Sequence, residues 1–198
     1  KAFLRFIGST LQCFPTRKFL GSTSVNSDQN VSEVKKVVAF DLDRTMFFCK
    51  DKFANPIWAK QMVAPLYLRD QGSVGDDVGS VCELNPVAWS LLQSLKDMEH
   101  VCCFVSSGRY FGISEQFQPS LGILKMFGLL HLFDPSLSVL EYKTFEKSQH
   151  FLKHPNHSFM LIDDNPTVRR EAEQANNCVA VDISETHLSL RVIKWLEI

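Results

Sequence analysis

Two acidic clusters, each at the end of an apolar run, constrain the fold of this chain more than any other feature. Asp41 and Asp43 follow the run Val37–Phe40, and Asp163 and Asp164 end a similar run much later in the chain. Uninterrupted apolar runs are typical of buried parallel strands. Side chains two residues apart share one face of a strand, and open α/β sheets bind ligands at the carboxyl ends of their strands. The sequence therefore predicts that both clusters reach one site.

A solvated acidic turn would explain the first cluster by itself. It does not explain a second cluster more than a hundred residues away, whereas neighbouring parallel strands would bring the two together. Carboxylates this close repel one another unless a cation lies between them or one of them is protonated. Because carboxylate oxygens suit a hard divalent cation, we expect one Mg²⁺ site.

The rest of the chain alternates between expected strands and helices, which predicts an α/β three-layer fold with a mainly parallel sheet. Further strands are expected at 101–105, 138–142 and 178–183. Asn85 and Pro86 should begin a helix whose apolar stripe is Val87, Leu91, Leu92 and Leu95. Other helical segments are expected at 114–117, 121–127 and 144–153.

Two more helices are expected near the end of the chain. One should begin at Pro166 and end at a left-handed turn formed by Asn176 and Asn177. Ser184 should cap the other, which would pack on the sheet through Leu188, Val192, Trp195 and Leu196.

Residues 31–198 should form one domain, since 198 residues with 45% hydrophobic side chains suit a single core. Within it, residues 46–82 contain many aromatic side chains among prolines and glycines. We expect an irregular excursion over the carboxyl end of the sheet, with a short helix at 58–62 and a flexible acidic loop at 72–79. Long loops in this position are usually functional, although an insert without a role in the chemistry remains the alternative.

Residues 1–30 form a basic tail. Before Asp28 the chain has four Lys or Arg residues and no acid, together with several Ser and Thr, which resembles a mitochondrial transit segment; an ordinary basic tail is the alternative. We therefore expect the mitochondrial matrix, or otherwise the cytoplasm. A net charge of −1 gives no electrostatic argument for nucleic-acid binding, and no apolar run is long enough to span a membrane.

The cysteines show no zinc-like spacing with the histidines and no C-x-x-C pair. We interpret them as buried thiols in a reducing compartment. The six are Cys13, Cys49, Cys82, Cys102, Cys103 and Cys178.

Taken together, the polar groups at these strand ends resemble the four motifs of the haloacid dehalogenase superfamily, in the same order. Asp41-Leu-Asp43-Arg-Thr45 matches its D-x-D-x-T motif, Ser106 its strand-end hydroxyl, and Lys147 its lysine. The acidic pair at 163–164 completes the set. Over roughly residues 36–183 the chain is most similar to the magnesium-dependent phosphatase group, which implies a Rossmann-like fold without a large cap domain.

The resemblance implies a phosphatase that hydrolyses a phosphate monoester. Asp41 would attack phosphorus to form an aspartyl-phosphate, Asp43 would act as acid and then base, and Thr45 would steady the turn. Ser106 and Lys147 would bind phosphoryl oxygens, with Ser107 and Lys143 as the alternatives. Mg²⁺ would be held by Asp41, the carbonyl of Asp43 and Asp163, with Asp164 in support.

One departure puts substrate recognition in doubt. The group carries Arg directly after the motif-two Ser, where this chain has Ser107, and Arg109 comes two residues later. The substrate class therefore stays open among phosphoproteins, phosphosugars and nucleotides.

A second interpretation is that the protein is an assembly or structural component of a large mitochondrial complex, such as a ribonucleoprotein. The tail would contact other proteins or RNA, and the aromatic side chains of the insert would anchor the interface. The aromatic residues that this interpretation predicts as interface anchors are Phe47, Phe48, Phe53, Trp58 and Tyr67.

Overall fold

The structure is a computed structural model, and it describes residues 34–70, 72–98, 101–107, 119–141 and 146–197. Backbone contacts divide the chain into Lys1–Val31 and Ser32–Ile198, so every described residue belongs to the second unit. The predicted tail and the predicted helical segment at 114–117 lie outside the described residues.

Five strands form a parallel sheet in the order β10-β9-β1-β7-β8. They are β1 (Lys35–Phe40), β7 (Val101–Ser107), β8 (Val139–Glu141), β9 (His157–Asp163) and β10 (Cys178–Asp182). The four apolar residues that end β1 are fully buried, as expected for a central strand covered on both faces. The predicted α/β class with a parallel sheet is confirmed.

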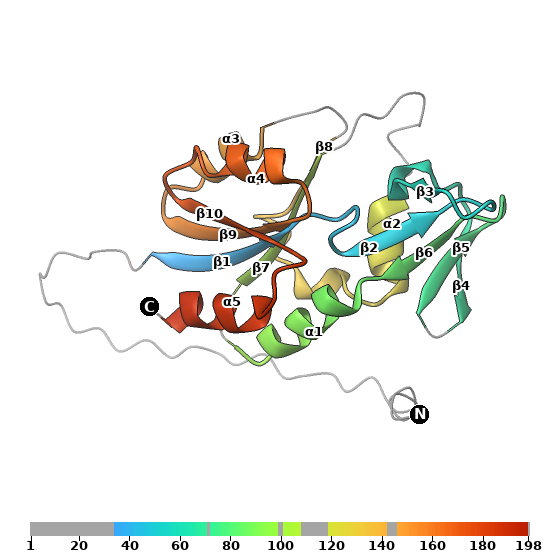
Figure 1. Cartoon of the computed structure of the whole chain (residues 1–198), viewed down its shortest axis with the longest axis horizontal. Coiled ribbons are helices and arrows are strands. Elements are labelled where there is room, and N and C mark those ends of the chain that lie inside the picture. Colours follow the sequence, from blue (N-terminus) through green and yellow to red (C-terminus); the bar gives the residue numbers. More distant parts are fainter. Residues whose placement is uncertain (1–33, 71, 99–100, 108–118, 142–145, 198) are drawn as a thin grey trace, which may run out of the picture. The chain divides into compact units, whose positions relative to one another are not determined.

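Helices lie on both faces of this sheet (Figure 1). Val38 and Phe40 of β1 belong to a core that includes residues of α1 (Pro86–Leu95), α2 (Pro119–Met126) and α5 (Leu188–Glu197). Their neighbours in the strand point the other way, into a second core with residues of α3 (Lys147–Leu152) and α4 (Pro166–Ala172). A 3₁₀ turn, η2 (Leu130–Leu132), follows α2.

The insert forms a five-stranded antiparallel sheet, so the prediction of an irregular excursion is wrong. Its order is β3-β2-β6-β5-β4. The strands are β2 (Phe47–Lys50), β3 (Pro56–Ile57), β4 (Leu66–Asp70), β5 (Ser73–Asp76) and β6 (Val81–Leu84), with the 3₁₀ turn η1 (Ala59–Gln61) where a short helix was expected. The strands are two to five residues long, too short for their apolar pattern to show between the prolines and glycines.

The flexible acidic loop predicted at 72–79 is also wrong in its first half. All four residues of β5 are buried. Asp76 is fully buried, and its carboxylate accepts hydrogen bonds from the backbone N–H groups of Val63, Val78 and Ser80. This carboxylate therefore stabilises the turn between β5 and β6.

The cysteine prediction holds for three residues and fails for two. Cys102, Cys103 and Cys178 are buried free thiols. Cys49 and Cys82 instead form a disulfide. They lie directly opposite each other on the antiparallel strands β2 and β6, a pairing that could not be anticipated while the insert was read as irregular. Cys13 lies outside the described residues.

Asn85 caps α1 as predicted, its side chain accepting a hydrogen bond from Val87 N–H. Val87 itself is 43% exposed, and Ala88 takes the buried position of the stripe instead. The apolar stripe therefore begins one residue later than predicted, because a helix that starts at Pro86 turns Ala88, and not Val87, toward the core.

α4 begins at Pro166 as predicted, but its predicted end and the predicted start of the last helix are wrong. α4 ends at Ala172, and neither Asn176 nor Asn177 is left-handed. The Asn177 side chain instead donates to three backbone carbonyls, those of Phe151, His154 and His157. Ser184 donates to Asp182, and α5 begins later, at Leu188.

Candidate functional site

Strand register brings Asp41 and Asp163 side by side. Phe40 pairs with Ile162 across β1 and β9, and the backbone N–H of Asp41 donates to the carbonyl of Ile162 at 2.9 Å. The next residue on each strand is an aspartate. Both carboxylates therefore lie at the carboxyl end of the parallel sheet, where such sheets bind their ligands.

Lys147 places its ammonium between these two carboxylates. Its Nζ atom lies 2.6 Å from Asp41 Oδ1 and 2.7 Å from Asp163 Oδ2. The Lys147 and Asp163 side chains are each 2% exposed, and that of Asp41 is 13% exposed. Lys147 is the first residue of α3, so this helix carries the cation to the strand ends.

The site holds more carboxylate charge than one ammonium neutralises. Burial raises the pKa of Asp41 to about 7; Lys147 acts in the opposite direction, and the charges of Asp163 and Asp43 add to the rise. Burial lowers the pKa of Lys147, but the charges of Asp41 and Asp163 outweigh it, so the pKa is raised overall. The cluster therefore favours an additional positive charge or a bound proton.

Asp164 is the third carboxylate of the cluster. Asp41, Asp163 and Asp164 each offer one carboxylate oxygen, and these three oxygens lie within 4.8 Å of one another. Burial and the charge of Asp163 raise the pKa of Asp164, and the charge of Arg44 lowers it. An all-oxygen donor set of this kind fits a hard divalent cation, Mg²⁺ or Ca²⁺.

Thr45 ties the loop after β1 to the loop after β9. Its side chain is fully buried, and Oγ1 accepts a hydrogen bond from Asp164 N–H at 3.1 Å. Its carbonyl accepts another from the Asn85 side chain at 2.8 Å. Thr45 therefore fixes the backbone beside the acid cluster.

Asp43 contacts the insert. Its Oδ1 accepts a hydrogen bond from Ala59 N–H, at the start of η1, at 2.6 Å. Because Ala59 is fully buried, this bond orients the Asp43 carboxyl group from the side of the insert. The charge of Asp43 still acts on Asp41.

Ser106 lies on β7, the other neighbour of β1, and is 3% exposed. Phe104, two residues earlier, pairs with Phe40, so Ser106 reaches the same end of the sheet as Asp41. Ser107 follows it in the strand. Lys143, the alternative lysine, and Arg109 lie outside the described residues.

Sequence reasoning missed Glu171, which holds the start of α3. Its carboxylate accepts hydrogen bonds from the backbone N–H groups of Lys147 and Ser148, each at 3.0 Å, and from the Ser148 hydroxyl. These contacts cap the helix that carries Lys147. The only available signal was a glutamate in the helix that follows the second acidic cluster.

Arg44 was also missed as a candidate. It has a left-handed backbone, with φ of 65°, and its guanidinium lies 4.4 Å from the centre of the Trp58 ring. Neither feature can be read from the sequence, because both depend on how the insert folds back beside the first motif.

The comparisons with known proteins add no assignment, since no family model and no curated protein matches this chain. In the part of the chain that the structure describes, no helix is long and apolar enough to cross a membrane.

Proposed function

We propose that this protein is a Mg²⁺-dependent phosphatase that hydrolyses a phosphate monoester through an aspartyl-phosphate. The observation that carries the proposal is the buried position of Lys147 Nζ between Asp41 and Asp163 at the carboxyl end of the sheet. A carboxylate nucleophile, a fixed cation and an oxygen-rich cation site are the groups that this chemistry needs.

We also propose that the fold is the Rossmann-like fold of the haloacid dehalogenase superfamily. The order of the groups along the chain supports this assignment: the D-x-D-x-T motif after β1, Ser106 on β7, Lys147 on α3 and the acidic pair after β9. The parallel sheet with β1 at its centre is compatible with it.

In the first step, an Asp41 carboxylate oxygen attacks phosphorus while the bond from phosphorus to the alcohol oxygen breaks. Asp43 donates its proton to that leaving oxygen. Lys147 holds the attacking carboxylate in place and stabilises negative charge on the phosphoryl group together with the Ser106 hydroxyl.

In the second step, Asp43 removes a proton from water, and the water oxygen attacks phosphorus. The bond between phosphorus and Asp41 then breaks, which releases inorganic phosphate and regenerates both carboxyl groups. The Ala59 N–H keeps the Asp43 carboxyl group oriented throughout.

The acid cluster fits the cation that this reaction requires. The three clustered carboxylates would hold Mg²⁺ with the Asp43 carbonyl, and the raised pKa values of Asp41 and Asp164 indicate charge that a cation would neutralise. Bound Mg²⁺ would neutralise phosphoryl charge and keep Asp41 ionised at neutral pH.

Hydrolysis of 4-nitrophenyl phosphate by the purified chain tests the proposal. We expect turnover with Mg²⁺, none with EDTA, and a loss on the order of 10⁴-fold in kcat for Asp41→Asn. Asp77→Asn, an exposed aspartate of the insert, is the matched control and should retain full activity. Equal rates for wild type and Asp41→Asn in the metal-loaded protein would refute the enzyme reading.

As a second candidate, we propose the assembly role in a mitochondrial complex, which the exposed aromatic side chains of the insert favour. Phe48, Phe53, Trp58 and Tyr67 are each more than 40% exposed, whereas Phe47 is fully buried, so its prediction as an anchor is wrong. Native fractionation of a mitochondrial extract tests this role: co-migration with a large particle supports it, and migration as a free monomer removes it.

A further inference from the structure

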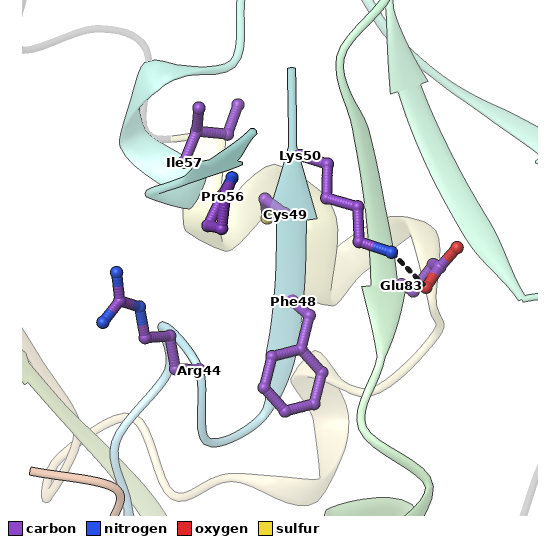
Figure 2. A pocket seen from close by; sticks show the side chains of 7 residues that line it. All are labelled: Arg44, Phe48, Cys49, Lys50, Pro56, Ile57 and Glu83. Carbon is purple, nitrogen blue, oxygen red and sulfur yellow. Dashed lines mark ion pairs between the residues drawn. The ribbon is translucent and has the colours of Figure 1, made fainter. Parts of the chain in front are cut away.

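A cavity of about 430 Å³ lies on the insert beside the first motif (Figure 2). Its volume is within the range of small-molecule sites. Apolar side chains form much of its wall, and three charged side chains contribute the rest. The lining residues are Arg44, Phe48, Cys49, Lys50, Pro56, Ile57 and Glu83.

Arg44 connects this cavity to the acid cluster. Arg44 directly follows Asp43 in the chain, and its guanidinium lies over the ring of Trp58. The next residue, Ala59, donates its backbone N–H to the Asp43 carboxylate. In Figure 2 the Arg44 side chain extends from the loop before β2 and lies on the same side of that strand as Pro56 and Ile57. The charge of Arg44 also acts on Asp164, so a side chain that lines the cavity lies close enough to the acid cluster to influence it.

The backbone of Arg44 is strained, and its side chain is exposed. A left-handed non-glycine residue costs roughly 1–2 kcal/mol, and glycine would fit this position without that cost. Among the ion pairs of the described residues, none involves Arg44, whereas Lys50 is paired with Glu83 at 3.7 Å. An arginine in a strained backbone position with an exposed charge therefore points to a use for that charge.

We propose that this cavity binds the alcohol portion of the substrate, and that this portion combines an apolar, planar body with a second anionic group recognised by Arg44. The proposal rests on the proposed phosphatase function. Phe48, Pro56 and Ile57 would cover the apolar body, and the planar guanidinium would bind a carboxylate or a second phosphate through two parallel hydrogen bonds.

Four substrates separate the two parts of the recognition: methyl phosphate, phenyl phosphate, 4-carboxyphenyl phosphate and 1,4-phenylene bisphosphate. For the wild type with Mg²⁺, we expect kcat/KM to rise from the methyl to the phenyl ester by more than the better leaving group alone explains, and the part of the rise that Phe48→Ala removes is the part due to the cavity. We expect a further rise of about three- to tenfold for whichever anionic ester fits Arg44. The two anionic esters show whether the group is a carboxylate or a phosphate.

Two variants assign these preferences to residues. Arg44→Gln should remove the preference for the anionic esters over phenyl phosphate, and Phe48→Ala should reduce the preference for phenyl over methyl phosphate. Lys194→Gln, an exposed lysine on α5, should change neither ratio. Binding of 4-hydroxybenzoate to Asp41→Asn, followed by Trp58 fluorescence with Trp58→Phe as the blank, gives a readout without turnover and should weaken in Arg44→Gln.

The outcomes separate this proposal from the one on which it rests. If no ester is hydrolysed, the phosphatase proposal fails. If all four esters are hydrolysed with similar kcat/KM, the phosphatase proposal stands and the leaving-group pocket is refuted. The pocket is also refuted if Arg44→Gln lowers kcat equally for every ester, because equal losses would indicate that Arg44 contacts the transferred phosphoryl group.

Discussion

Replacing Lys147 by Met should destabilise the metal-free protein by about 3–5 kcal/mol at pH 8. That is the usual cost of removing one partner from a buried ion pair. Here the ammonium lies 2.6 and 2.7 Å from two carboxylates, and its removal leaves Asp41 and Asp163 buried without their cation. Methionine matches the length and volume of lysine, so a packing defect contributes little.

The destabilisation should shrink at pH 5, because protonation then relieves the uncompensated charge. The pKa of Asp41, about 7, lies above its value in an unfolded chain, so the folded state binds more protons between about pH 4 and pH 7 and stability falls as the pH rises through that window. Without Lys147, which lowers this pKa, the window extends to higher pH and the total fall in stability becomes larger. Mg²⁺ should restore part of the lost stability at pH 8, since a cation bound to the folded state stabilises it.

Urea unfolding at pH 5 and pH 8, each with EDTA or Mg²⁺, measures these effects. Lys194→Met is the matched control: it removes an exposed lysine of α5 and should change the free energy of unfolding by less than about 0.5 kcal/mol. The electrostatic account of the site is wrong if Lys147→Met is no worse than Lys194→Met at pH 8 in EDTA. It is also wrong if the destabilisation is larger at pH 5.

Three further variants test the parts that support the site. Glu171→Gln removes the charge that caps α3, so kcat for an aryl phosphate should fall while the free energy of unfolding drops by about 1–2 kcal/mol in urea titrations; unchanged kcat would show that Glu171 has no part in positioning Lys147. Thr45→Val leaves the Asp164 N–H without its acceptor and should cost about 1–3 kcal/mol by thermal unfolding, whereas Thr45→Ser should cost less. Cys49→Ser removes the disulfide, which joins residues 33 apart, and should lower the free energy of unfolding by about 3–4 kcal/mol under oxidising conditions. Unfolding of this variant should no longer respond to dithiothreitol. A variant whose unfolding responds to dithiothreitol as much as that of the wild type would contradict the disulfide.

The parallel sheet could be predicted because its information is local. β1 and β9 are buried and largely apolar, and each leads into an acidic pair. Once those strands are neighbours, register alone brings Asp41 beside Asp163. The acid cluster at the carboxyl end of the sheet therefore follows from the sequence pattern and from general sheet geometry.

The insert could not be predicted in the same way, because its structure depends on pairing between short strands. Cys49 and Cys82 are 33 residues apart and meet only through the alignment of β2 with β6. The contact between Ala59 and Asp43 likewise requires η1 to fold back against the first motif. The contact of Glu171 with α3 depends on how two helices pack side by side on one face of the sheet.

Trapping the phosphorylated enzyme tests the central claim most directly. Wild-type protein is mixed with an aryl phosphate and Mg²⁺, quenched in acid within milliseconds, digested and analysed by mass spectrometry. The proposed mechanism predicts an acyl phosphate on Asp41, absent in Asp41→Asn and longer-lived in Asp43→Asn, which lacks the base for the second step. Turnover without any phosphorylated aspartate, or a phosphate on a residue other than Asp41, would contradict it.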